Sequence, residues 1–214
     1  MGKDQALWLA GTLPQHHEVA RAEREGRGLV LIERKSKPVT RVGVLTVDEV
    51  TPVDVEPFLT EADRPAMIVV IPTRALWTGD AIRAVESEGI AWGKMYDLYR
   101  ALNQEDDLAL YTNPGREFVD RMLDQHRNID AWERISDRSY RIVRAVGSDL
   151  KIATSQEYEL TADAVRDAYA RLAPFDILLN TNPYGRISAQ ARAVAAKLEI
   201  SIADSDSLYK LLKP

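Results

Sequence analysis

The sequence predicts an α/β protein made of two tandem copies of one unit, residues 1–103 and residues 104–214. Apolar runs of strand length alternate with segments of helical periodicity, which is typical of a sheet covered by helices. The segments also recur, because residues 67–85 match residues 176–194 at a spacing of 109. Matches at a spacing of 110 lie on either side, and together they predict an internal duplication whose copies pack with pseudo-twofold symmetry.

The elements of the first copy follow from apolar periodicity and from residues that begin or end helices. The run at 67–71 is almost wholly apolar, as in parallel strands covered on both faces. Gly89 ends the helical pattern that follows this run. In chain order we expect a strand at 6–10, a polar amphipathic helix at 14–26, strands at 29–33 and 41–47, a short helix at 53–60, a strand at 67–71, and helices at 78–88 and 94–102.

The second copy repeats this order after a short connection at 103–107 that is not rich in Gly, Ser or Pro. At its start the spacing falls to 100, so that Thr112 and Pro114 match Thr12 and Pro14. An insertion of ten residues is therefore expected around 125–137. In chain order we expect a strand at 108–111, a helix at 115–127, strands at 141–145 and 149–155, a helix at 161–172, a strand at 176–179, a helix at 188–198, a strand at 200–202 and a helix at 205–212.

The composition excludes several classes of protein. With 45% hydrophobic residues the chain can bury a core, so intrinsic disorder is excluded. The absence of cysteine excludes disulfides, thiol nucleophiles and cysteine-based metal centres. No apolar run approaches the roughly 20 residues of a membrane span, so we expect a cytoplasmic protein without a membrane partner. The formal net charge of −5 argues against a uniformly basic nucleic-acid coat.

Common catalytic and cofactor motifs are missing from the sequence. The adjacent pair His16 and His17 points to different sides of a predicted helix and does not form a metal site with Glu18. No Gly-x-Ser-x-Gly, P-loop or Gly-x-Gly-x-x-Gly sequence occurs. We therefore expect no catalytic residue, no bound metal and no cofactor.

The second copy has a distinctive order of segments from Ile152 onward. A strand, a polar turn and a helix ending at Leu172 lead to a second strand and the turn Asn180-Thr181-Asn182. An alanine-rich helix, a short apolar strand, an acidic turn and a Leu-x-x-Leu helix follow. Over about 60 residues this order resembles the C-terminal part of the Mrr-like branch of restriction endonuclease-like domains. The first copy shares the resemblance through the repeat.

The resemblance implies where nuclease chemistry would lie. Members of the family use an acidic residue on one strand and Asp, Glu or Gln two positions before Lys on the next, and the carboxylates hold Mg²⁺. Here Gln156 is followed by Tyr158 where Lys is needed, and residues 140–144 contain no carboxylate. The resemblance thus implies a scaffold that has lost nuclease chemistry. Our leading hypothesis is a non-enzymatic protein that binds nucleic-acid backbone or another protein.

One alternative is an active Mg²⁺-dependent nuclease with a rearranged site in the first copy. Glu33 and Lys35 form a Glu-x-Lys sequence, and Asp48 and Glu49 follow the next strand. These four residues would supply the catalytic groups, with Mg²⁺ as the cofactor. The same residues are also typical of the exposed ends of strands.

A second alternative is a sensor of a small anionic ligand. The turns that follow the two buried strands carry small polar residues and an arginine, and free N–H groups at a helix start can bind anions. Such residues are also ordinary caps and turns. The candidate residues are Thr181, Asn182, Gly185 and Arg186, with Thr73 and Arg74 in the first copy.

A basic stretch in the first copy is the candidate contact to nucleic acid. Residues 21–41 contain seven basic and three acidic side chains. Each Lys or Arg that meets a phosphate releases about one counterion. The stretch has no aromatic residue for base stacking, so the contact would be to the backbone. The candidate residues are Arg34, Lys35, Lys37 and Arg41.

Overall fold

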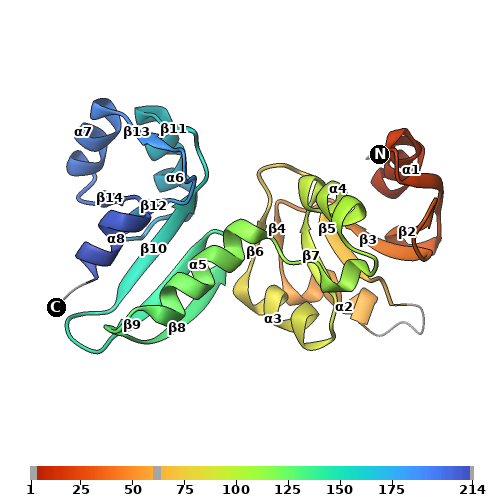
Figure 1. The fold of residues 1–214 in the computed structure, drawn as a ribbon, viewed down its shortest axis with the longest axis horizontal. Coiled ribbons are helices and arrows are strands. Elements are labelled where there is room, and N and C mark those ends of the chain that lie inside the picture. The colour runs from red at the N-terminus through yellow and green to blue at the C-terminus, as the bar shows by residue number, and fades with distance from the viewer. Residues whose placement is uncertain (1–3, 60–63, 213–214) are drawn as a thin grey trace. The chain divides into compact units, whose positions relative to one another are not determined.

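The computed structural model describes residues 4–59 and 64–212. The chain divides into two compact units, Met1–Asn113 and Pro114–Pro214 (Figure 1). Each unit contains a five-stranded sheet with helices on both faces, so the chain has the α/β class that the sequence predicts.

The first unit is built on a mixed sheet. Its strands are β1 (Val19–Arg24), β2 (Leu29–Arg34), β3 (Thr40–Leu45), β4 (Glu49–Val50), β5 (Met67–Val70), β6 (Leu76–Trp77) and β7 (Ala91–Lys94). The five-stranded sheet has the order β1-β2-β3-β5-β7, antiparallel from β1 to β3 and parallel from β3 to β7. Strands β4 and β6 form a separate parallel pair.

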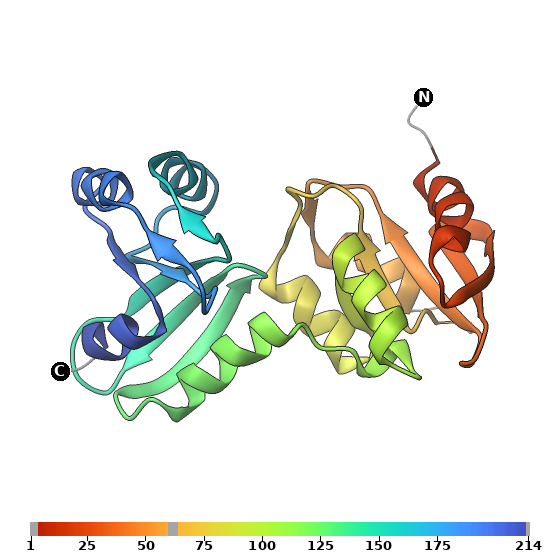
Figure 2. The ribbon, with the colours of Figure 1, turned by 45° about the horizontal axis from the view of Figure 1, so that its top comes forward.

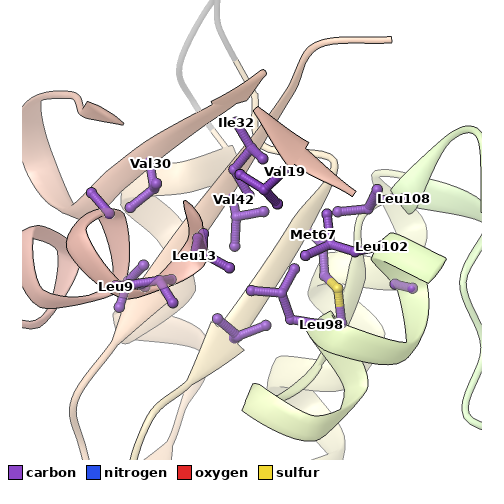
Figure 3. Packing of buried hydrophobic residues seen from close by; sticks show 14 of the residues in the cluster. Leu9, Leu13, Val19, Val30, Ile32, Val42, Met67, Leu98, Leu102 and Leu108 are labelled. Atoms are coloured by element: carbon purple, nitrogen blue, oxygen red, sulfur yellow. The ribbon is translucent and has the colours of Figure 1, made fainter. Parts of the chain in front are cut away.

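Two cores hold the first unit together, one on each face of the sheet. Its helices are α1 (Gln5–Thr12), α2 (Pro52–Leu59), α3 (Gly79–Ser87) and α4 (Met95–Gln104). Because side chains alternate along a strand, each buried strand contributes to both cores. Leu9, Met67 and Leu98 pack in the core beneath α1 and α4 (Figure 3). Phe58 and Trp77 pack in the core beneath α2 and α3.

The second unit has the same architecture. Its elements are α5 (Pro114–Gln125), β8 (Ile129–Ser136), β9 (Ser139–Arg144), β10 (Leu150–Ser155), β11 (Glu159–Leu160), α6 (Ala162–Leu172), β12 (Ile177–Asn180), β13 (Arg186–Ile187), α7 (Ala189–Lys197), β14 (Ser201–Ala203) and α8 (Ser205–Leu211). The sheet order is β8-β9-β10-β12-β14. Helices α5 and α8 pack on one face of this sheet and α6 and α7 on the other (Figure 2).

Every strand pairing of the first unit recurs in the second with both partners displaced by 110 residues. Val19 pairs with Arg34, and Ile129 pairs with Arg144. The same displacement relates β2/β3 to β9/β10, β3/β5 to β10/β12, β5/β7 to β12/β14 and β4/β6 to β11/β13. The two units are therefore copies of one fold in one register. The predicted spacings of 100 and 109 are wrong, and the predicted insertion around 125–137 does not exist.

The beginning of the first copy also differs from the prediction. Residues 6–10, predicted as a strand, lie in α1, because alanine and leucine favour helices and the Asp4 carboxylate accepts a hydrogen bond from the Leu7 N–H at 3.1 Å. Residues 14–26 are predicted as a helix. In the structure this range contains the end of the 3₁₀ turn Leu13–Gln15 and the whole of strand β1. Strand β1 lies at the sheet edge with mostly polar, exposed side chains, so its sequence lacks the apolar pattern of a strand.

The second copy differs from the prediction at equivalent places. Residues 108–111, predicted as a strand, contain the 3₁₀ turn Leu108–Leu110. Strand β8, the counterpart of β1, is not predicted from the sequence because charged side chains alternate irregularly along this edge strand.

The connection between α4 and α5 is bound to the first unit. Asp97 is 5% exposed and accepts hydrogen bonds from the Tyr111 hydroxyl at 3.0 Å and from the Asn113 side chain at 2.7 Å. Leu108 and Tyr111 are buried in the core beneath α1 and α4. Residues 108–113 therefore pack as part of the first unit.

Candidate binding site at the C-terminal edge of the second sheet

The carboxylates of the nuclease alternative lie at opposite ends of the first sheet. Glu33 lies beyond the last β2–β3 pair, at the edge where β3 begins. Asp48 and Glu49 follow the end of β3. Because β3 has six residues with a rise of about 3.3 Å each, roughly 20 Å of strand separates the two groups. The structure does not bring Glu33 and Lys35 together with Asp48 and Glu49.

Two residues of the basic stretch bind main-chain carbonyls inside the first unit. Arg34 is 7% exposed, and its guanidinium donates to the carbonyls of Leu102, Glu105 and Asp106, the last at 2.7 Å. Lys37 Nζ donates to the carbonyls of Leu102 and Glu105 at 3.4 and 3.0 Å. These carbonyls lie at the C-terminal end of α4, where cations are stabilised by the helix dipole. Burial lowers the pKa of Arg34, and the Asp106 charge opposes this shift.

The other two residues of the stretch differ from each other. Lys35 is exposed, whereas Arg41 is half-buried and donates from Nε to the Glu25 carboxylate at 2.9 Å. Among the four candidates, Lys35 alone has an exposed side chain. Arg34 and Lys37 serve the fold of the first unit.

The second unit binds the equivalent carbonyl in a different way. Leu212, the counterpart of Leu102, accepts a hydrogen bond from Asn128 Nδ2 at 2.7 Å. Arg144, the counterpart of Arg34, instead donates from Nε to the Ser148 carbonyl at 2.7 Å. The end of the last helix is thus closed in both copies, by residues that are not equivalent.

The predicted anion-binding turn is tied to the loop that follows β10. Asn180 is 2% exposed, and its Nδ2 donates to the Glu157 carbonyl at 2.9 Å. Its Oδ1 accepts from the Asn182 N–H at 3.3 Å. Asn182 Nδ2 donates to the Gln156 carbonyl at 3.3 Å. We call the two loops, residues 156–158 and 181–186, the clasp, and hydrogen bonds to the strand ends at Ser155 and Asn180 hold it in place.

Main-chain groups of the turn complete the clasp. The N–H and the hydroxyl of Thr181 both donate to the Ser155 carbonyl, at 2.7 and 3.0 Å. The Gly185 N–H donates to a carbonyl within the turn at 2.9 Å, and the Arg186 N–H donates to the Tyr158 carbonyl at 2.8 Å. These N–H groups are therefore engaged within the protein, whereas the Arg186 side chain is exposed.

The equivalent turn of the first unit is built differently. Thr73 and Arg74 are exposed, and the Thr73 carbonyl accepts a hydrogen bond from Lys94 Nζ at 3.2 Å. Val70 and Ala75 stand at the positions of Asn180 and Gly185. A valine side chain cannot make the hydrogen bonds of Asn180, so the first unit does not repeat the side-chain part of the clasp.

Replacing Gly185 with alanine should destabilise the second unit by about 1–3 kcal/mol. A Cβ atom on Gly185 would lie 2.5 Å from Asn180 Nδ2 and 2.9 Å from the Asn182 carbonyl oxygen, so the clasp would have to shift. Urea unfolding followed by far-UV circular dichroism measures the loss.

The double variant Asn180→Val with Gly185→Ala is the matched control, because it recreates the Val70 and Ala75 pair of the first unit. We expect the alanine to be better tolerated in this background. Losses that simply add would contradict the steric explanation.

Three positions beneath the clasp differ in kind between the two copies. Ser139, Ser155 and Asn180 lie at the same edge of the sheet and are 8%, 5% and 2% exposed. Ser155 pairs in register with Asn180, and all three face α6 and α7 by strand alternation. We call these three residues the polar corner. Their equivalents, buried in the core beneath α2 and α3, are Leu29, Leu45 and Val70.

The hydroxyl groups of the polar corner have spare hydrogen-bonding capacity. Ser139 Oγ lies 2.6 Å from Ser136 Oγ, which also accepts the Arg138 N–H at 3.2 Å. In the described part of the chain, the Ser155 hydroxyl has no hydrogen-bond partner. Asp137, in the same turn as Ser136, is 9% exposed and engaged with other residues.

Two tyrosines on the clasp are strongly exposed. Tyr158 is 62% exposed and Tyr184 is 79% exposed. At the equivalent positions the first unit has Asp48 and Arg74, so the aromatic pair belongs to the second copy alone. Exposure cannot be read from one sequence, and neither tyrosine is predicted there as a binding residue.

Within the described residues, the serines of the polar corner have no histidine beside them. A serine nucleophile is activated by an adjacent base, whereas His126, the histidine of the second unit, lies beside α8 with its Nε2 3.4 Å from the Tyr209 carbonyl oxygen. Across residues 4–59 and 64–212, no group of three or more His, Asp or Glu side chains could hold a metal ion.

In residues 4–59 and 64–212, no helix has the length and apolar character needed to span a bilayer. In comparisons with family models, curated proteins and solved structures, the chain matches none.

Proposed function

We propose that the protein is a non-enzymatic nucleic-acid-binding protein that holds a single strand at the clasp of its second unit. The proposal keeps the hypothesis of a nuclease-like scaffold without nuclease chemistry, and it moves the contact away from the basic stretch of the first unit. The observation that carries it is the exposed pair Tyr158 and Tyr184 on two loops joined by hydrogen bonds.

Stacking is the main source of affinity in this proposal. Bases of a single strand stack on aromatic side chains at about 1–3 kcal/mol per base, without strong sequence preference. Both tyrosines belong to the clasp, so their loops lose little freedom when a strand binds. A duplex keeps its bases stacked inside, and we expect it to bind more weakly.

Charge plays a smaller part. Arg186 is exposed next to the tyrosines and can meet a phosphate, but the exposed residues Glu157 and Glu159 flank Tyr158 and repel the backbone. We therefore expect a shallow dependence of affinity on salt. Arg34 and Lys37 are bound to carbonyls of the first unit and are not expected to contribute.

Fluorescence anisotropy with labelled single-stranded oligonucleotides tests the proposal. Tyr158→Ser and Tyr184→Ser should each weaken binding by about 5- to 100-fold, because each removes one stacking surface. Tyr96, a 66% exposed tyrosine of the first unit, provides the matched control, and Tyr96→Ser should bind as the wild type does.

Two results would contradict the proposal. One is that the wild-type protein binds no oligonucleotide at low salt. The exposed tyrosine pair would then be a contact surface for a protein partner. The other is an equal loss in the Tyr96 variant, which would show that binding is not localised at the clasp.

A further inference from the structure

The polar corner replaces an apolar core with hydroxyl and amide groups. The first unit fills the same three positions with Leu29, Leu45 and Val70, so the fold itself does not require polar residues there. Buried polar side chains stabilise a protein less than apolar ones unless they are fully hydrogen-bonded. A buried polar group that the fold does not need is typical of a functional position.

The hydrogen bonds of the corner are incomplete. Both ends of the Asn180 amide are used within the clasp. The hydroxyls of Ser136 and Ser139 share one hydrogen bond, so one of their two protons is free to be donated elsewhere. Ser155 is 5% exposed, and its hydroxyl has no partner among residues 4–59 and 64–212. Ser139 and Ser155 lie on neighbouring strands and face the same side of the sheet.

These groups match a hydroxyl of the ligand better than a phosphate. Serine hydroxyls both donate and accept, as a sugar hydroxyl does. The adjoining turn carries the buried carboxylate of Asp137 beside the half-buried Arg138, so it has no excess of positive charge to attract an anion. The 2′-hydroxyl is the donor and acceptor that distinguishes RNA from DNA.

We propose that Ser155 and Ser139 of the polar corner, together with the neighbouring Ser136, recognise a ribose 2′-hydroxyl, so that the strand bound at the clasp is RNA. This inference rests on the proposed function. The tyrosines of the clasp hold the bases, and both loops that carry them are hydrogen-bonded to Asn180, which pairs with Ser155. In this proposal the 2′-hydroxyl of a sugar between two stacked bases meets the corner at this end of the strands.

The test compares RNA and DNA oligonucleotides of one sequence by fluorescence anisotropy. Wild-type protein should bind RNA about five- to tenfold more tightly, the effect of roughly one hydrogen bond. Ser155→Ala should bind RNA as weakly as DNA, with unchanged affinity for DNA. Ser201→Ala, which alters an exposed serine of the same unit, should keep the preference.

A second arm needs no variant. RNA with 2′-O-methyl groups has no hydroxyl proton to donate, and wild-type protein should bind it as it binds DNA. Equal affinity of the wild type for RNA and DNA, or a preference that survives Ser155→Ala, would overturn the inference and leave the proposed function standing. Binding of neither strand would instead overturn the proposed function.

Discussion

Replacing Trp77 with alanine should destabilise the first unit by about 3–5 kcal/mol, the range for a fully buried aromatic side chain. Trp77 is 0% exposed, and its indole N–H donates to the Gly93 carbonyl at 3.2 Å. Its ring packs on Trp92 with centroids 5.4 Å apart. The variant therefore loses apolar burial and leaves the Gly93 carbonyl without this donor.

Amide hydrogen exchange separates this effect from the second unit. Protection of β3 and β5 should fall in Trp77→Ala, while protection of β10 and β12 should not change, because these strands belong to separate cores. Ile187→Ala is the matched control at the equivalent position, where the side chain is only half-buried, and its effect should be clearly smaller. A loss below about 1 kcal/mol for Trp77→Ala would show that the core beneath α2 and α3 repacks readily.

Replacing Arg34 with methionine should destabilise the first unit by about 2–4 kcal/mol. Methionine keeps the apolar stem, but the carbonyls of Glu105 and Asp106 lose a charged donor. Urea unfolding measures the change in free energy, and protease cleavage within 104–113 should become faster because this segment is no longer held at its start.

Arg144→Met is the control at the equivalent position of the second unit. Its hydrogen bond to the Ser148 carbonyl is exposed, so we expect a loss below about 1 kcal/mol. Arg34→Met should also bind oligonucleotides as the wild type does if the clasp is the contact. A large loss of oligonucleotide binding without a loss of stability would instead show that Arg34 contacts nucleic acid, as the basic stretch predicts.

Most of the fold could be predicted because buried strands and amphipathic helices carry strong periodic patterns. The apolar strand β5 and the helix α3 with its Thr78 cap are examples. Edge strands β1 and β8 carry no such pattern, since one side of each meets solvent. The sequence predicts a strand where α1 lies, because a short apolar run is compatible with both structures.

The candidate site could be predicted only in part. The turn from Asn180 to Arg186 is conspicuous in the sequence, whereas its hydrogen bonds to residues 155–158 require the parallel pairing of β10 and β12. The polar corner is hidden because its residues are far apart in sequence. At a spacing of 110, Asn180 aligns with Val70 and the contrast is evident, but at 109 it aligns with Ile71.

The use of Arg34 also could not be predicted from composition. A local excess of positive charge is typical of a phosphate-binding surface and also of cations that bind the carbonyls at the end of a helix. The carbonyls that Arg34 binds lie about 70 residues away in the sequence. Which of the two applies depends on tertiary contacts alone.

The shared register of the two copies allows incorrect strand pairing between them while the chain folds. Strand β3 presents the same hydrogen-bonding frame as β10, so either can align beside β5 or β12 and form a hybrid sheet, a failure typical of tandem domains. Side chains discriminate against such hybrids, since a hybrid would place Ser155 at the position of Leu45 in the apolar core beneath α2 and α3. The different residues in the two cores therefore favour the pairing of each strand with strands of its own unit.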